Sequence, residues 1–464
     1  MIFHNVIRSL LGITRRCLPR ERCFSEPSPE AGKPAIRVND AIRTSEEPLI
    51  NGEGENMAII FETIIQPLIP LIKEEANQLK NDEKTYKLSL YYFTLSLIYI
   101  VINQVKSIRL FITELKTKPE LKKLDFVLAS PSMYSEAFSR YKPQIFQRIF
   151  IRLLEIVQIQ DIPEIKTLGI FMLVDGSLFP AFKTMEWAEY SSKCQALKMH
   201  LAYELNRMIP VAFMSTAANY SERKALIAFL QAGVTYITDR GYLAFDIFQK
   251  ITAHQAFFIT RIRYNINATV QTALEVNIPE SWNLFLSNIT DALVIFSGDK
   301  SKQTYRLICF YVGGEWYRIT TNRFDLKTSE IIMLYAYRWQ VELFFRCIKR
   351  TLNALHLWNH EPDGVKIQFY IYLIVYVLLI SFKQTLIQDK EKIDQQTSMA
   401  SSPKEDAPLQ KNGEARLPKC GLVSLLGSKL KRLWKISIHW LTCIKNLLLH
   451  PMTDEHRDII LSTQ

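Results

Sequence analysis

Three acidic residues that lie far apart in the chain occupy positions from which their carboxylates could meet. Asp175 directly follows the apolar segment LGIFMLV, Asp239 follows VTYIT, and Glu342 belongs to a long amphipathic segment. Three hard oxygen ligands suit Mg²⁺ or Mn²⁺. Two such ions, held side by side, activate a water or a 3′ hydroxyl and stabilise the leaving oxygen in an in-line displacement at phosphorus. The three residues are therefore candidate metal ligands for phosphoryl transfer.

Each of these acidic residues also has an ordinary structural explanation. An aspartate at the end of a strand is often a turn former or a helix cap. Glu342 lies among unlike charges at spacings of four and seven residues, which are common on a solvated, salt-bridged helix face. The residue types alone do not separate these explanations.

The segment from 328 to 355 is predicted to form one amphipathic helix, with Thr328 or Ser329 as its N-cap. At 3.6 residues per turn, its sequence gives one polar stripe and one broad apolar face. The stripe carries Tyr335, Arg338, Glu342, Arg346 and Lys349. Glu342 is therefore expected to face outward among cations, on a helix that is anchored by its apolar side.

Residues 168 to 260 have the pattern of an α/β sheet. Apolar segments at 168–174, 196–203, 209–215, 234–238 and 256–260 predict strands, and the segments 221–232 and 240–251 predict helices. Three strands, a helix, a strand, a helix and a strand is the order of a ribonuclease H-like α/β sheet, in which chemistry gathers at strand ends. We therefore expect a ribonuclease H-like catalytic domain at 165–388, interrupted by a β-rich insertion at about 261–322.

The remaining segments are predicted to be helical or irregular. Residues 57–160 have helical periodicity and a basic rim, so they form either a DNA-binding domain or an ordinary helical domain. Residues 1–56 are expected to be a disordered extension, although a mitochondrial presequence would show the same basic start. Residues 389–418 are predicted to be a linker and 419–464 a basic helical tail.

Two uncharged apolar segments, 88–105 and 367–382, raise the alternative of a membrane protein. The first contains several polar side chains and the second is short for a span, so we predict that both are buried core helices.

Charge and cysteine usage limit the class of protein. The net charge of +11, from 57 Lys and Arg against 46 Asp and Glu, favours a polyanionic partner. Seven scattered cysteines without a CxxC pair indicate neither a zinc site nor a disulfide framework, and they fit a reducing cytoplasm.

Several sequence blocks together resemble one protein family. Tyr335, Arg338, Glu342 and Lys349 are separated by gaps of two, three and six residues inside YAYRWQVELFFRCIK. The blocks LVDGS, LKMHLAYELNRMIP, TDRGY and ITTNRFD precede them in that order. Residues 168 to 382 thereby resemble the DDE transposases of bacterial insertion sequences, in the cut-and-paste, hairpin-forming branch that has a Tyr-Arg-Glu-Lys signature.

This resemblance implies roles for individual residues. Asp175, Asp239 and Glu342 would be the catalytic, metal-binding triad, and they would hold Mg²⁺ or Mn²⁺, with two ions as the expected number. Tyr335, Arg338 and Lys349 would bind DNA phosphates near the transposon end. Trp316 would stack on a flipped base, although a core position in the β-rich insertion is an alternative for it. Lys198 and His200, on the second strand, are predicted to be structural.

The resemblance also implies an activity and its partners. The protein would cleave double-stranded DNA at terminal inverted repeats, form and open a hairpin on the element end, and join that end to target DNA. It would act as a homodimer on paired ends, in the bacterial cytoplasm at the nucleoid and without a membrane. The alternatives are a catalytically inactive DNA-binding protein derived from a transposase, and a membrane protein.

Overall fold

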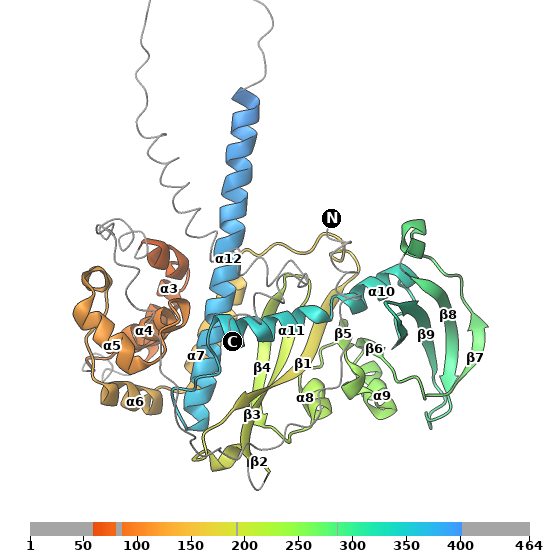
Figure 1. The fold of residues 1–464 in the computed structure, drawn as a ribbon, viewed down its shortest axis with the longest axis horizontal. Coiled ribbons are helices and arrows are strands. Elements are labelled where there is room, and N and C mark those ends of the chain that lie inside the picture. Colours follow the sequence, from red (N-terminus) through yellow and green to blue (C-terminus); the bar gives the residue numbers. More distant parts are fainter. Residues whose placement is uncertain (1–58, 80–85, 192–193, 285, 401–464) are drawn as a thin grey trace, which may run out of the picture.

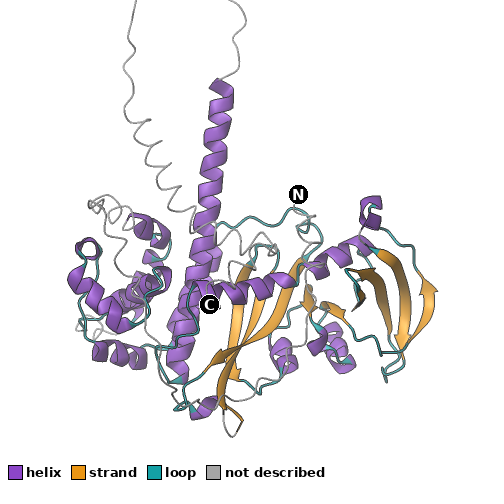
Figure 2. Cartoon of the chain, in the orientation of Figure 1, coloured by secondary structure: helices purple, strands orange, loops and turns teal. Residues whose placement is uncertain are grey.

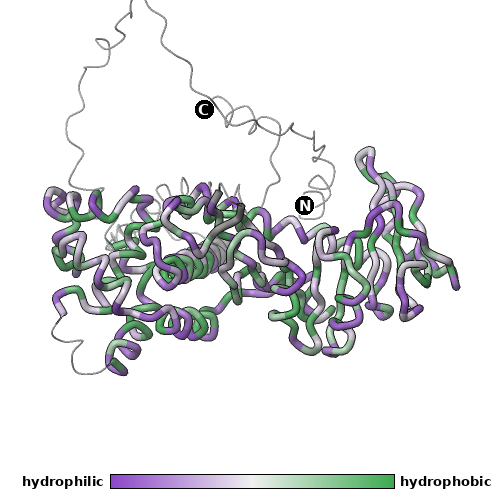
Figure 3. Tube along the Cα trace, turned by 90° about the horizontal axis from the view of Figure 1, so that it is seen from below, coloured by the Kyte–Doolittle hydropathy of each residue, from purple (hydrophilic) through white to green (hydrophobic). Residues whose placement is uncertain are grey.

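The structure, a computed structural model, describes residues 59–79, 86–191, 194–284 and 286–400. The predicted extension at 1–56 and the predicted tail at 419–464 lie outside the described residues. Figure 1 shows a helical region at one end of the long axis, a sheet in the middle and the predicted insertion at the other end. Hydrophobic segments, green in Figure 3, run through both the helical region and the sheet.

The described part of the N-terminal region consists of helices joined by loops and contains no strand. Its helices are α3 (Ile69–Gln78), α4 (Leu90–Ile102), α5 (Ile108–Thr117), α6 (Pro131–Arg140) and α7 (Pro143–Ile156). The hydroxyls of Ser89, Ser107 and Ser130 accept a backbone hydrogen bond at the starts of α4, α5 and α6. Nearly every residue of α4 is buried, so this apolar segment is a core helix, as predicted. A DNA-binding role for this region stays a prediction.

The central sheet has the strand order of a ribonuclease H-like fold, which confirms the predicted fold class. Strands β1 (Ile170–Pro180), β3 (Cys194–Glu204) and β4 (Ile209–Ala217) are antiparallel neighbours, with the short β2 (Glu189–Ser191) beside β3. Strands β5 (Val234–Thr238) and β6 (Phe257–Arg261) then follow parallel to β1. The core order is therefore β4-β3-β1-β5-β6. Figure 2 draws the strands of the sheet in orange.

The β-rich insertion extends this sheet. Its strands are β7 (Ala268–Ala273), β8 (Ser287–Phe296), β9 (Thr304–Val312) and β10 (Glu315–Thr321). Because β10 pairs with β6, the core and the insertion form one ten-stranded sheet. A buried ion pair between Arg306 and Asp291, with 2.7 Å between Nη2 and Oδ2, joins β9 to β8.

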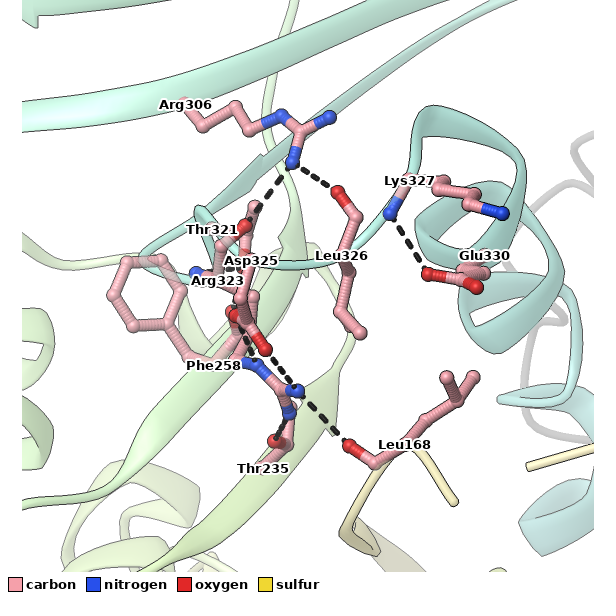
Figure 4. A network of polar contacts seen from close by, with 10 residues as sticks. All are labelled: Leu168, Thr235, Phe258, Arg306, Thr321, Arg323, Asp325, Leu326, Lys327 and Glu330. Atoms are coloured by element: carbon pink, nitrogen blue, oxygen red, sulfur yellow. Dashed lines mark hydrogen bonds and ion pairs between the residues drawn. The ribbon is translucent and has the colours of Figure 1, made fainter. Parts of the chain in front are cut away.

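A polar network fixes the return from the insertion to the core. Arg323, just after β10, binds the Asp325 carboxylate, the Thr235 hydroxyl on β5 at 2.7 Å and the Leu168 carbonyl at 2.9 Å (Figure 4). Gly169 has a φ angle of +119°, a backbone conformation that residues other than glycine rarely adopt. The start of β1 and the chain that leads to Glu342 are thereby tied to the same point of the sheet.

The segment predicted as a single helix over 328–355 is interrupted, so that prediction is wrong in part. It consists of α10 (Thr328–Ala336), α11 (Trp339–Arg346) and a π-helical turn, η6 (Cys347–Thr351). Between α10 and α11 the backbone tightens, because the Arg338 N–H bonds to the Tyr335 carbonyl three residues back. The helix begins one residue earlier than predicted, with Lys327 as N-cap, since the Thr328 hydroxyl instead donates to Asp291.

The last described helix, α12 (Pro362–Ala400), packs on α4, α6, α7 and β4. The linker predicted from residue 389 is therefore wrong for 389–400, which are helical, and 401–418 lie outside the described residues. In the described part of the chain, Pro362–Thr385 is long and apolar enough to cross a membrane, but 78% of its most apolar window is buried inside the protein. This burial is the behaviour predicted for a closing core helix.

Candidate active site

Asp175 lies within β1, so the prediction that its strand ends at Val174 is wrong. The strand continues to Pro180 because β3 stays paired with it, with Asp175 opposite Leu201. On its other side β1 pairs with β5 only as far as Leu173. Among the described residues, no strand pairs with the β5-facing edge of β1 beyond Leu173, beside Asp175.

Asp239 directly follows β5, as predicted, and precedes the short helix η4 (Arg240–Tyr242). In the parallel β1–β5 ladder, Leu173 lies opposite Ile237. Asp175 and Asp239 are each two residues beyond this pair, and successive side chains of a strand alternate between its faces. The two aspartates are therefore at the same level of the sheet and on the same face.

Glu342 reaches this region from α11, which packs against β1 (Figure 1). Its carboxylate is partly buried and accepts a hydrogen bond from Arg338, with 2.7 Å between Nη2 and Oε1. Burial opposes the charge of Arg338, but the neighbouring Tyr335, Glu342 and Asp239 outweigh it and raise the Arg338 pKa above its ordinary value. Arg338 thus stays charged between two of the three acidic residues.

The electrostatics of Asp175 reflect its surroundings. Burial raises the pKa of Asp175 to about 7, while Arg338 and a 2.8 Å hydrogen bond from the Gly176 N–H lower it. The charges of Glu342 and Glu222 raise it further. A cation beside Asp175 would favour its ionised form, because an opposite charge lowers the pKa of a carboxylate.

Lys349 approaches Asp175 from the π-helical turn. Its ammonium donates a 2.7 Å hydrogen bond to the Ser177 hydroxyl and lies 4.7 Å from the centre of the Phe179 ring. Burial lowers the pKa of Lys349, and Asp175 raises it. Arg338 and Lys349 thus place two cations next to the candidate acidic residues.

A cavity of about 450 Å³ lies between the sheet and α10–α11. Five of the seven predicted site residues line it, namely Asp239, Glu342, Tyr335, Arg338 and Trp316, whereas Asp175 and Lys349 do not. Trp316 is 52% exposed, so the core alternative is wrong for it, and Trp282 is the buried tryptophan of the insertion. The remaining charged and aromatic residues of the lining are Arg240, Arg261, Tyr264, Glu315, Tyr317, Arg318 and Trp339.

The three acidic residues have the chemistry of metal donors, but they are not gathered into one metal site in this structure. Across the described residues, no three His, Cys, Asp or Glu side chains lie close enough to hold one ion together. The donor set nevertheless fits a hard divalent cation, because all three groups are carboxylates and Asp175 is partly buried and is affected by the charges of Glu342 and Glu222.

Three further residues lie close to the candidate site. The sequence assigned no role to Glu222, and it predicted a structural role for Lys198 and His200. Glu222, the first residue of α8 (Glu222–Ala228), pairs with Lys198 at 3.3 Å between Oε1 and Nζ. His200 is fully buried and contacts the Thr216 hydroxyl through Nε2, and burial and Lys198 lower its pKa to about 4. An acidic residue in the first turn of a helix is ordinary, so no signal in the sequence distinguishes Glu222.

Comparisons with known proteins agree with the strand order. Residues 167–378, a little under half of the chain, match the family model described as a transposase DDE domain. Over 210 residues the chain is 27% identical to a protein of Sinorhizobium fredii that is named as a transposase, y4zB, covering 45% of this chain and 59% of that protein. Over 202 residues it is 26% identical to a protein of Geobacillus stearothermophilus named as the probable transposase of insertion sequence element IS5377, covering 42% of this chain and 52% of that protein.

The chain thus spans between half and three-fifths of the length of these two relatives. A chain in the cryo-EM structure of the piggyBac transposase synaptic complex with hairpin DNA is similar at a TM-score of 0.38 and 9% identity, over 72% of this chain and 76% of that one. This similarity is too low to support an assignment, so the fold is assigned from the observed strand order. Residues 167–378 thus match the transposase DDE domain model in sequence, and their strand order is that of a ribonuclease H-like fold.

Proposed function

We propose that this protein is a metal-dependent transposase that cleaves double-stranded DNA at terminal inverted repeats and joins the freed 3′ hydroxyl to target DNA. The observation that carries the proposal is the common level of Asp175 and Asp239 at one edge of the parallel ladder, with α11 and Glu342 packed against β1. The three carboxylates belong to separate elements that pack around this point of the sheet, in a domain that matches the transposase DDE family.

Asp175, Asp239 and Glu342 would hold Mg²⁺ or Mn²⁺, with two ions as the expected number. When bound, the ions would activate a water or a 3′ hydroxyl and neutralise the leaving oxygen. Arg338 now neutralises Glu342 at 2.7 Å. Its guanidinium would turn from Glu342 to a DNA phosphate as the carboxylates draw together, because bidentate pairing with phosphate suits its planar fork.

The cavity offers a surface for the DNA end. Arg240, Arg261, Arg318 and Arg338 line it together with the aromatic residues Tyr264 and Trp316, of which Tyr264 is 89% exposed. Arginines bind the phosphate backbone, and exposed aromatic rings stack on unpaired bases. Trp316 would take a flipped base here, and Tyr335, Arg338 and Lys349 would hold the adjoining phosphates, as in the hairpin-forming branch.

We further propose that two copies act on paired ends in the bacterial cytoplasm. The +11 net charge supports a DNA partner, because a basic protein gains affinity by releasing counterions from DNA.

Cleavage of a labelled duplex that carries the element's own terminal repeat tests the proposal. With Mg²⁺, the wild type should cut at the repeat end. Glu342→Gln should bind the duplex as well as the wild type but not cut it, and Glu330→Gln, on the same helical segment but outside the site, should cut normally. Binding without cutting in the wild type would instead support an inactive DNA-binding protein.

A further inference from the structure

The hydroxyl of Ser177, two residues after Asp175 in β1, accepts a hydrogen bond from Lys349. The distance between Lys349 Nζ and Ser177 Oγ is 2.7 Å. The same ammonium lies 4.7 Å from the centre of the buried Phe179 ring. Because β1 pairs with β3 without a bulge here, its alternate residues Asp175, Ser177 and Phe179 share one face. Ser177 and Phe179 therefore hold the Lys349 ammonium on the face of β1 that carries Asp175.

The π-helical turn η6 brings Lys349 to this position. The Leu352 N–H bonds to the Cys347 carbonyl, five residues back, at 3.0 Å, so the turn is wider than a turn of α-helix. On an ideal α-helix Lys349 would lie two turns after Glu342 on the same stripe. In the structure it contacts β1, and it does not line the cavity that Arg338 lines. The two candidate phosphate-binding cations thus lie in different surroundings.

Lys349 is held in place without being neutralised. Its side chain is half-buried, so part of the water around its charge is removed. An ammonium has three donors. Among the described residues, Ser177 alone accepts a hydrogen bond from Lys349, and no carboxylate forms an ion pair with it. A partly desolvated cation without a counter-ion favours an anionic oxygen as its next partner.

The simplest alternative is that the hydrogen bond from Lys349 to Ser177 only fastens η6 to the sheet. Apolar contacts already fasten it, since Cys347 and Ile348 are buried in the same core as Phe171 and Leu173 of β1. The hydrogen bond adds little to such a core. Its main effect is on the direction of the Lys349 side chain, whose four-carbon stem is otherwise flexible.

We propose that Ser177 is a positioning residue for DNA, which holds the Lys349 ammonium in place for one backbone phosphate of the DNA end, a different phosphate from the one that Arg338 binds. The inference rests on the proposed function and extends its set of DNA-binding residues. Ser177 acts through Lys349. Because the flexible side chain is ordered in advance, binding DNA loses less conformational entropy.

Fluorescence anisotropy with the full chain and a duplex that carries the element's own terminal repeat tests this inference, without divalent metal so that the DNA stays intact. Lys349→Met should weaken binding by about tenfold or more, because one charged hydrogen bond is lost. Ser177→Ala should weaken it by about twofold to tenfold, the cost of ordering one long side chain on binding. Ser177→Thr keeps the hydroxyl and should bind like the wild type. Ser287→Ala, an exposed serine at the start of β8, is the matched control and should also bind like the wild type.

The double variant Ser177→Ala/Lys349→Met separates positioning from a structural role. If Ser177 acts through Lys349, the double variant should bind like Lys349→Met alone, because the two effects are not additive. An equal loss from Ser177→Ala with and without Lys349 would overturn the inference. Urea unfolding of each variant verifies that it is folded in the assay.

Single methylphosphonates, each of which removes the charge of one phosphate, test whether the two cations contact different phosphates. One replacement should weaken binding by the wild type but not by Lys349→Met. A replacement at another phosphate should weaken the wild type but not Arg338→Gln. If the same replacement is silent in both variants, the assignment of separate phosphates is wrong.

Binding and cleavage together distinguish failure of this inference from failure of the proposed function. If the wild type cuts the repeat and Lys349→Met weakens binding, but Ser177→Ala binds as tightly as the wild type, Ser177 is not a positioning residue and the proposed function stands. A wild type that neither prefers the terminal repeat over unrelated DNA nor cuts it with Mg²⁺ contradicts both.

Discussion

Arg338 donates a 2.7 Å hydrogen bond to Glu342, four residues later, so the candidate catalytic glutamate is already neutralised by a cation on its own helical segment. The same guanidinium also acts on Asp175 and Asp239. A metal ion that recruits Glu342 must therefore compete with Arg338. Under the proposed function, this competition would keep the site inactive until DNA supplies another partner for the arginine.

Arg338→Gln should lower the Mg²⁺ concentration for half-maximal cleavage by about tenfold, because the competing charged hydrogen bond is lost. The maximal rate should also fall, since a phosphate contact disappears. Arg346→Gln is the comparison variant: Arg346 lies four residues after Glu342 and interacts with it through charge, without the hydrogen bond that Arg338 makes, so its loss should shift the midpoint less. Cleavage rates measured across a Mg²⁺ series would contradict the competition if Arg338→Gln kept the wild-type midpoint.

Trp316→Ala should weaken binding to a DNA end with an unpaired base by about fivefold to a hundredfold, the usual contribution of one stacked base. Binding to a blunt duplex should change little. Phe324→Ala is the control, since Phe324 is 54% exposed but does not line the cavity. Fluorescence anisotropy with both DNA forms makes the comparison, and equal losses on both forms would argue against stacking.

The position of Asp239 at the end of its strand could be predicted from the sequence, because a short, fully apolar strand has a clear end. β5 was predicted to the residue, and Asp239 with it. The prediction ended β1 six residues too early, because DGSLFP lacks the apolar character of a buried strand. Those residues are held extended by pairing with β3, a tertiary contact that has no signature in their own sequence.

The sequence shows which residues form the polar stripe of the 328–355 segment, but it does not show where each of their side chains points. An ideal count of 100° per residue places Lys349 beside Glu342, whereas the π-helical turn and the hydrogen bond to Ser177 direct it to β1. Glu222 could not be singled out, because its approach to Gly176 and Gly241 depends on how α8 packs on the sheet.

Asp291→Ala should destabilise the protein by about 3–5 kcal/mol, because Arg306 would remain as a buried, unpaired charge. Asp291 also accepts a 2.7 Å hydrogen bond from Thr328, so α10 should loosen as well. Asp363→Ala, which breaks an exposed pair with Lys142 at 3.7 Å, should cost less than about 1 kcal/mol. Urea unfolding followed by tryptophan fluorescence measures both, and similar losses in the two variants would refute the buried-pair argument.

Asp299→Asn should lower the free energy of unfolding at neutral pH and have little effect in acid. Burial alone would raise the pKa of Asp299, but hydrogen bonds from Ser301, Gln303 and Tyr305 outweigh it and hold the pKa below its ordinary value. The ionised carboxylate therefore stabilises the folded state fully above the unfolded pKa of about 4, and this advantage disappears as the pH falls through the folded pKa. We expect Asp299→Asn to lose about 1–3 kcal/mol of unfolding free energy at pH 7 and to approach the stability of the wild type at pH 3.

Exposed Asp246→Asn, in the first turn of α9 (Phe245–Ala253), is the control. Thermal unfolding from pH 7 to pH 3 tests the sign, because a gap between Asp299→Asn and wild type that widens in acid would mean that the pKa is raised.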